Sequence, residues 1–224
     1  MAALPDRCEV VVVGGGVIGV SVAYHLAEAG IQDVVLLERK ELTSGTTWHA
    51  AGLVGQLRTS INMTQLARYT SELYRGLEAE TGQATGYRQC GSISIAATAE
   101  RFEELKRSAS MAKVFGLEVN VLSVAQIAER YPLIQTEDLH GGIHIPSDGY
   151  ANAVDITQAL AKGARNRGAR IFTDTKVEAI LRDGDRVTGV RTADGEIQSQ
   201  YVVVCGGTWS RNVAAAVAVN QSLH

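Results

Sequence analysis

The chain has 224 residues, of which 46% are apolar and 20% are charged, and its formal net charge is −3. This balance is typical of a soluble globular protein, and it argues against disorder and against nucleic-acid binding. Glycines interrupt the apolar runs. No run reaches the roughly 20 residues that are needed to span a membrane, so we expect no membrane segment. The three cysteines are far apart, and the residues before Cys8 are too few for a targeting peptide. These features predict a cytoplasmic protein with reduced thiols, or a mitochondrial-matrix protein if the source is eukaryotic.

The first predicted elements form a dinucleotide-binding unit. The β-branched run Glu9–Val13 is typical of a parallel strand that is buried on both faces. It leads into GGGVIG, in which Gly14, Gly16 and Gly19 fill the spacing G-x-G-x-x-G. The first glycine allows a tight turn, the second lets a pyrophosphate approach the backbone, and the third lets the next helix lie against the strand. We expect that helix at about residues 17–29, with an apolar face made of Ile18, Val22, Leu26 and Ala29.

The second predicted strand, DVVLLE, ends in Glu38, about 20 residues after Gly19 as a dinucleotide site requires. A carboxylate at this place can accept hydrogen bonds from both ribose hydroxyls of an adenosine. Its charge would repel a 2′-phosphate, which argues against NADP. A glycine-rich turn in another kind of βαβ unit is the alternative, but the strand, fingerprint, helix, strand and acidic residue follow in the expected order.

The loop after Glu38 has the sequence RKELTSGTTWHAAGL, which is rich in small and hydroxyl residues and can lie along a long cofactor. Thr46 and Thr47 offer hydroxyl donors. On its own, His49 would most simply be a core histidine in a close-packed loop. Small residues that would let backbone amides approach a ligand stand at Gly45, Ala50, Ala51 and Gly52.

Three segments carry a resemblance to a known family. The glycine fingerprint, LLERKELTSGTTWHAAGL and DGYANAVDITQALAKGAR resemble the FAD-dependent dimethylglycine and sarcosine dehydrogenases of the D-amino-acid-oxidase-like flavoprotein superfamily, from about Glu9 to the last residue. The resemblance implies that the dinucleotide is FAD and that His49 carries a covalent bond to the 8α-methyl carbon of the flavin. We expect Trp48 to pack beside the flavin ring. The cofactor-binding residues expected on these grounds are Gly14, Gly16, Val17, Ile18, Gly19, Glu38, Arg39, Gly45, Thr46, Thr47, Trp48, His49, Ala50, Ala51, Gly52, Leu53, Val177, Gly206, Gly207 and Trp209.

The middle of the chain predicts a long helix followed by a strand. The helix is expected at residues 62–80, and the strand at residues 87–96, which by the resemblance enters the substrate-side sheet. The residues at helical spacing that are expected to face the core are Met63, Leu66, Ala67, Thr70, Leu73, Tyr74 and Leu77.

Two further helices and one histidine pair follow. Residues 99–115 predict a charged surface helix that ends at Gly116, and Ser123 with Gln126 predicts a capping box for a short helix before Pro132. His140 and His144 are four residues apart, but the glycines between them disfavour a helix and no third ligand is near, so we expect no metal site.

The last third of the chain returns to the nucleotide domain. We expect a helix at residues 154–167 that ends at Gly168, two strands within ARIFTDTKVEAIL, and a last strand at residues 196–204. The Asp-Gly pairs at 183–184 and 194–195 predict the turns of a small β-meander. The resemblance implies that the backbone of Val177 contacts the adenine and that the turn at Gly206 and Gly207 covers the phosphate side of the cofactor. Without the resemblance, this glycine pair is an ordinary strand-to-helix turn.

The predicted fold class is α/β: a Rossmann-like FAD-binding domain with a parallel sheet and a β-meander, plus a partial antiparallel substrate-domain sheet. The FAD-binding domain is expected at residues 1–85 and 146–224, and the substrate domain at 86–145. Members of the family continue further, with the rest of the substrate sheet and, in many, a tetrahydrofolate-binding region. We therefore expect an N-terminal fragment, with exposed strand edges that predict poor solubility or a partner chain that supplies the missing strands.

The resemblance implies a dehydrogenase or oxidase that acts on small amines such as sarcosine or dimethylglycine, with hydride transfer from the N-methyl carbon to flavin N5. It names neither the electron acceptor nor, among these residues, a general base. Two alternatives stay open. One is an amine oxidase with noncovalent FAD, similar to glycine oxidase. The other is a non-catalytic flavoprotein-like subunit of the pyruvate dehydrogenase phosphatase type, or an inactive fragment.

Overall fold

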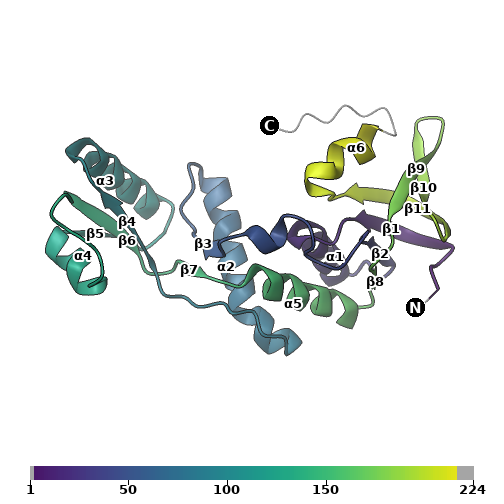
Figure 1. Ribbon diagram of the computed structural model, residues 1–224, viewed down its shortest axis with the longest axis horizontal. Coiled ribbons are helices and arrows are strands. Elements are labelled where there is room, and N and C mark those ends of the chain that lie inside the picture. The colour runs from purple at the N-terminus through teal and green to yellow at the C-terminus, as the bar shows by residue number, and fades with distance from the viewer. Residues whose placement is uncertain (1–2, 216–224) are drawn as a thin grey trace. The chain divides into compact units, whose positions relative to one another are not determined.

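The computed structural model of the chain describes residues 3–215 (Figure 1). Contacts divide the chain into two units, the first comprising Met1–Ala51, Gly76–Thr85 and Asn152–His224, and the second comprising Gly52–Arg75 and Gly86–Ala151. Residues 52–75 and 146–151, which the sequence prediction assigned to the FAD-binding domain, thus fall in the second unit. The reason lies in a two-stranded ladder within that unit, in which β3 (Leu53–Val54) pairs with β7 (Gly149–Tyr150). Residues 216–224, the end of the predicted FAD-binding domain, lie outside the described residues.

The first unit is built on a six-stranded sheet. Its strand order is β8-β2-β1-β11-β10-β9. The first four strands run parallel, and the fourth of them, β11, also forms an antiparallel meander with β10 and β9, as predicted. In the register, Val13 of β1 stands level with Leu37 of β2 and Val204 of β11, so these three strands end together at one edge of the sheet. The strands are β1 (Arg7–Val13), β2 (Val34–Leu37), β8 (Arg170–Phe172), β9 (Val177–Asp183), β10 (Arg186–Thr192) and β11 (Gly195–Val204).

The first strand is buried on both faces, which confirms the prediction for its β-branched run. Side chains of successive strand residues point to opposite faces of a sheet. Val11 and Val13 pack in a cluster with residues of the meander, including Ile180, Val190 and Ile197. Val10 and Val12 are equally buried and point to the other face. The strand therefore anchors the unit from both sides.

Two helices of the first unit, α1 (Val17–Glu28) and α5 (Ala153–Asn166), contact each other and the parallel strands (Figure 1). The predicted buried face of α1 is wrong: Ile18 is 66% exposed, and the buried residues are Gly19, Val20, Ala23, Tyr24 and Ala27. Gly19 fixes this face, since a Cβ there would lie 2.0 Å from the carbonyl oxygen of Gly14. Tyr24 lies on the same face and packs over Gly163 of α5, where a Cβ would come within 2.7 Å of the ring.

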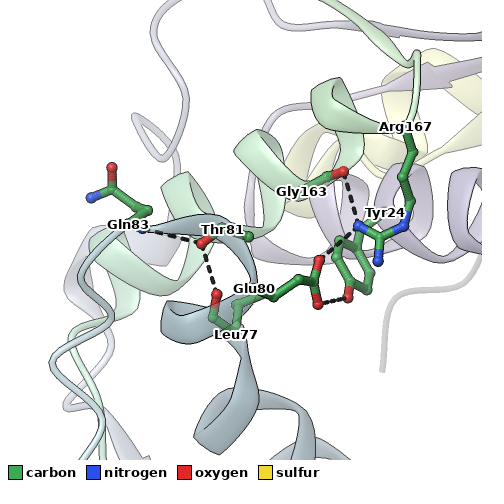
Figure 2. A network of polar contacts seen from close by, with 7 residues as sticks. All are labelled: Tyr24, Leu77, Glu80, Thr81, Gln83, Gly163 and Arg167. Carbon is green, nitrogen blue, oxygen red and sulfur yellow. Dashed lines mark hydrogen bonds and ion pairs between the residues drawn. The ribbon is translucent and has the colours of Figure 1, made fainter.

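A polar network joins these helices to the end of α2 (Ile61–Thr81) (Figure 2). The Tyr24 hydroxyl donates to Glu80 Oε2 at 2.7 Å, and Arg167 donates to Glu80 Oε1 at 2.7 Å and to the carbonyl of Gly163 at 3.1 Å. Burial alone would raise the pKa of Glu80, but the hydrogen bonds from Arg167 and Tyr24 outweigh it and hold that pKa below its usual range.

Helix α2 lies where the 3.6-residue period predicted it, but of the predicted buried face only Leu77 is fully buried. Met63 and Leu66 are 51% and 57% exposed. The buried positions are mostly hydroxyl residues, whose polar atoms find partners: the Thr64 hydroxyl accepts from the amide of Arg58, and the Ser71 hydroxyl bonds the hydroxyl of Tyr87 at 2.7 Å. Hydrogen-bond partners offset the free-energy cost of burying polar side chains. The spacing of apolar residues in the sequence does not show which polar residues have such partners.

The second unit contains, besides most of α2, an antiparallel sheet with strand order β4-β6-β5, a helix of 16 residues and a helix of 7 residues. The helix before Gly116 and the capping box of Ser123 and Gln126 are confirmed. The predicted strand at 87–96 begins only at Ser92, since of the residues before it Arg88 forms just an isolated bridge. The core of this unit packs α3 on the sheet through residues such as Leu105, Ala109 and Ile143. The elements are β4 (Ser92–Ala96), α3 (Ala99–Val114), β5 (Asn120–Leu122), α4 (Val124–Arg130) and β6 (Gly141–Ile145).

Three short helices complete the first unit: η1 (Thr47–His49), η2 (Gly207–Trp209) and α6 (Ser210–Ala215). Within residues 3–215, no group of three metal-ligating side chains gathers around His140, His144 or elsewhere. None of the described helices combines the length and apolar character needed to cross a bilayer.

Candidate functional site

A cavity of about 750 Å³ lies in the first unit, where β1, β2 and β11 end. Its walls come from the glycine turn before α1, the loop after β2, the start of β9 and the turn after β11. Brought together from the predicted set are Gly14, Gly16, Val17, Ile18, Glu38, Arg39, Gly45, Thr46, Thr47, Ala50, Val177, Gly206, Gly207 and Trp209. These residues are spread over nearly 200 positions of sequence, and the level ends of the parallel strands bring them to one place.

Six residues of the predicted set do not line the cavity. Gly19 is buried between α1 and the glycine turn, where it allows close packing. Gly52 and Leu53 belong to the second unit. The remaining three, Trp48, His49 and Ala51, are exposed residues of the first unit beside Thr47 and Ala50, which do line the cavity.

The glycine turn leaves no room for side chains. Gly14 has φ +117, and a Cβ there would lie 2.4 Å from the carbonyl oxygen of Cys205. Gly16 is the N-cap of α1, whose first intrahelical bond runs from the Val20 amide to the Gly16 carbonyl at 3.0 Å. The start of the helix thus faces the cavity with the positive end of its dipole, a favourable place for phosphate oxygens.

Glu38 is held rigidly at the end of β2. It is 9% exposed, its Oε2 accepts from the amide of Gly15 at 2.6 Å, and its Oε1 accepts from the amide of Lys40 at 2.9 Å. A carboxylate has about four acceptor positions, so both oxygens can accept further hydrogen bonds from a ligand in the cavity. The first of these amide contacts also ties the carboxylate to the glycine turn.

The loop that carries His49 follows a strained course. Thr43 has φ 71, a left-handed conformation that is uncommon for a β-branched residue, and its amide donates to the carbonyl of Gly15 at 3.0 Å. Thr47 is buried and its hydroxyl oxygen accepts from the amide of Val17 at 3.0 Å. His49 is exposed, and its ring stacks on Trp48 with 3.8 Å between centroids. The interpretation of His49 as a core histidine is therefore wrong.

At the rim, Arg39 lies over the ring of Trp209, with 3.9 Å from its guanidinium carbon to the ring centroid. The sequence analysis missed Thr175 and Lys176, which also line the cavity. The sequence predicts a strand just before these two residues. In the structure this strand, β8, pairs in parallel with β2, so the chain after β8 reaches the same edge of the sheet. Cys205 lines the cavity too, and burial raises the pKa of its thiol, which keeps it protonated.

The residues of the cavity fit FAD. A volume of about 750 Å³ lies within the range of small-molecule sites. The glycine cradle would be filled by a Cβ at Gly14 or Gly15, the helix start suits a pyrophosphate, and the fixed carboxylate suits a ribose. Arg39 and Lys176 add positive charge around a cofactor that carries two negative phosphates.

Comparison with protein families matches residues 9–223 to the family described as FAD dependent oxidoreductase (DAO). Mouse (Mus musculus) pyruvate dehydrogenase phosphatase regulatory subunit, mitochondrial, is 42% identical over 208 residues, which are 93% of this chain and 24% of that protein. Human (Homo sapiens) sarcosine dehydrogenase, mitochondrial, is 42% identical over 226 residues, which are 98% of this chain and 25% of that protein. The crystal structure of L-proline dehydrogenase from P.horikoshii matches with a TM-score of 0.92 and 25% identity, over 99% of this chain and 58% of that one. The chain spans about a quarter of the length of these two curated relatives.

Proposed function

Because the chain belongs to the FAD dependent oxidoreductase family, we propose that its cavity binds FAD through a covalent bond to His49 and that the protein oxidises small N-methyl amino acids such as sarcosine or dimethylglycine. The observation that carries this proposal is the cavity at the level ends of β1, β2 and β11, with the exposed His49 two residues after the cavity-lining Thr47.

Each wall of the cavity has a task in this proposal. The start of α1 at Gly16 binds the pyrophosphate, the Glu38 carboxylate binds the ribose hydroxyls, and the backbone of Val177 contacts the adenine. The bound flavin supplies the redox chemistry, by accepting a hydride from the carbon next to the substrate nitrogen. The protein holds the cofactor and presents the substrate carbon to it.

His49 suits the attachment because its imidazole is accessible. Its ring is exposed and is held against Trp48, so a ring nitrogen can reach a ligand without unfolding of the core. Ala50 lines the cavity directly after it. We assign no general base, since in the described residues the cavity holds no group whose position implies proton transfer.

The attachment is tested by denaturing gel electrophoresis under ultraviolet light. Protein purified without added FAD is expected to give a fluorescent flavin band that survives acid precipitation, and His49→Ala is expected to abolish the band while the released flavin remains detectable in the supernatant. A matched Trp48→Phe variant is expected to keep the band. A wild-type protein whose flavin is fully released by acid would contradict the covalent bond and favour the noncovalent amine oxidase.

A second candidate function is favoured by one of the relatives, the mouse pyruvate dehydrogenase phosphatase regulatory subunit, which is 42% identical. In this alternative the chain keeps the FAD fold but performs no amine oxidation. Anaerobic addition of sarcosine or dimethylglycine separates the two: an amine dehydrogenase loses the visible absorbance of its oxidised flavin, whereas a regulatory subunit keeps it.

A further inference from the structure

The loop that carries His49 is fastened to the glycine turn at two points. The amide of Thr43 donates to the carbonyl of Gly15, and the amide of Val17 donates to the hydroxyl oxygen of Thr47, both at 3.0 Å. Thr47 is 8% exposed and lies so close to the turn that a Cβ added to Gly16 would stand 3.1 Å from its hydroxyl oxygen. The second contact thus joins residues that are 30 positions apart in the sequence.

The same threonine is the first residue of the single helical turn that ends in His49. The amide of His49 donates to the carbonyl of Thr46, and the amide of Ala50 donates to the carbonyl of Thr47, both at 3.1 Å. These two hydrogen bonds hold Thr47 and His49 within one turn of 3₁₀ helix, so a displacement of Thr47 also displaces His49.

The hydrogen bond between Val17 and Thr47 also leaves the Thr47 hydroxyl able to contact a ligand in the cavity. The amide of Val17 belongs to the first turn of α1, where backbone donors have no partner within the helix. Thr47 satisfies this donor with its oxygen, and a hydroxyl oxygen that accepts still has its own proton to donate. Because Thr47 lines the cavity, one side chain contacts the helix start, the ligand space and the turn that bears the imidazole.

We propose that Thr47 is a positioning residue for flavin attachment: its hydroxyl fixes the His49 turn to the start of α1, so that a cofactor seated on the glycine turn meets the imidazole in one defined place. The inference rests on the proposed attachment at His49. Thr47 itself takes no part in the chemistry.

In the attachment step, a C–H bond of the flavin 8α-methyl group and an N–H bond of the His49 imidazole break, and a C–N bond forms between the two groups. The two protons and two electrons pass to dioxygen, which becomes hydrogen peroxide. A misplaced imidazole slows bond formation even when the cofactor is fully bound, because orientation contributes to the rate separately from affinity.

The test measures the rate of covalent incorporation in apoprotein as a function of FAD concentration, by acid-stable flavin fluorescence. Thr47→Val keeps the shape of the side chain and removes the hydrogen bond. It is expected to lower the limiting rate at saturating FAD by about fivefold, the change that a buried hydrogen bond of roughly 1 kcal/mol provides. Thr47→Ser retains the hydroxyl and is expected to restore the rate.

Thr81→Val is the matched control. Thr81 is also a buried threonine of the first unit, and its hydroxyl oxygen accepts from the amide of Gln83 at 3.2 Å, but it does not line the cavity. We expect this variant to leave the limiting rate within twofold of wild type. Melting temperatures of all variants, measured without FAD, establish that each is folded.

The outcomes separate the two proposals. A limiting rate of Thr47→Val within twofold of wild type, or an equal loss in Thr81→Val, overturns the positioning role while the attachment stands. A wild-type protein that binds FAD but forms no acid-stable flavin overturns the attachment, and the positioning role falls with it.

Discussion

At the scale of single residues, the glycines of the fingerprint lack a Cβ and therefore allow backbone segments to pack closely. Gly19 shows this most sharply, since a Cβ on it would stand 2.0 Å from the carbonyl oxygen of Gly14 and 3.2 Å from the side chain of Cys205. Neither neighbour can give way, because the first is backbone of the turn and the second lies at the end of β11 beneath it. The glycine therefore sets the distance between α1 and the sheet.

Gly19→Ala is expected to destabilise the first unit by about 3 kcal/mol, since an added methyl group must push the helix away from the turn. The free energy of unfolding from urea titration measures the effect. Gly76→Ala is the control: Gly76 lies in α2 with nothing within 4 Å of its added Cβ, so alanine there is expected to be neutral or to stabilise by up to about 1 kcal/mol. Equal effects of both substitutions would contradict this role of Gly19.

At the scale of elements, two helices of the first unit and the end of α2 that belongs to this unit meet in the network of Figure 2. Tyr24 comes from α1, Glu80 from the end of α2, and Arg167 follows α5. The guanidinium of Arg167 also lies 4.9 Å over the Tyr24 ring. Burial and the hydrogen bond to Glu80 raise the pKa of Tyr24, so its hydroxyl remains a donor throughout the physiological range. The network fixes the last turn of α2 to the helix pair.

Glu80→Gln is expected to lower the stability at pH 7 by about 1 kcal/mol, a figure discounted because the side chains of Glu80 and Arg167 are 34% and 30% exposed. The sign of the pH dependence follows from the lowered pKa of Glu80. Its stabilisation is complete above the ordinary pKa of 4.5 and is lost as the pH falls through the lower folded value. The difference between wild type and variant, from thermal unfolding at several pH values, should therefore vanish in acid.

Glu72→Gln is the matched control for this measurement. Glu72 also pairs with an arginine, Arg68, but at 4.0 Å and with both side chains largely exposed. Such a pair contributes little. A variant at this position that matched the loss from Glu80→Gln would show that general surface charge, and not the network, is responsible.

At the scale of the whole molecule, the candidate site belongs to one unit. Every residue that lines the cavity lies in the first unit. A ligand that binds only the folded form stabilises the structure that holds it against unfolding. FAD binding should therefore protect the first unit and leave the β4-β6-β5 sheet of the second unit unchanged.

Hydrogen exchange measures this directly. In the His49→Ala protein, FAD at 100 times its dissociation constant is expected to slow exchange in β1 and β11 by about 100-fold, where exchange proceeds through unfolding of the first unit. Exchange in β4 and β6 serves as the internal reference. Protection of equal size in both units would show that they unfold together.

The sequence by itself determined the features that depend on neighbouring residues. The glycine spacing, the β-branched strands, the Asp-Gly turns of the meander and the capping box of Ser123 and Gln126 all act within a few positions. For this reason the order of elements and the place of the nucleotide turn were predictable. The α/β class with a parallel sheet and meander is confirmed.

Only the tertiary structure decided which faces are buried and which distant groups meet. The buried face of α1 follows from Gly19 and from the contact with α5, and not from the apolar period that favoured Ile18. The exposure of His49 and the bond between Val17 and Thr47 depend on a loop pressed against a turn 30 residues away. Such contacts join residues that are far apart in the sequence, so no short segment of the chain contains both partners and local sequence patterns cannot predict them.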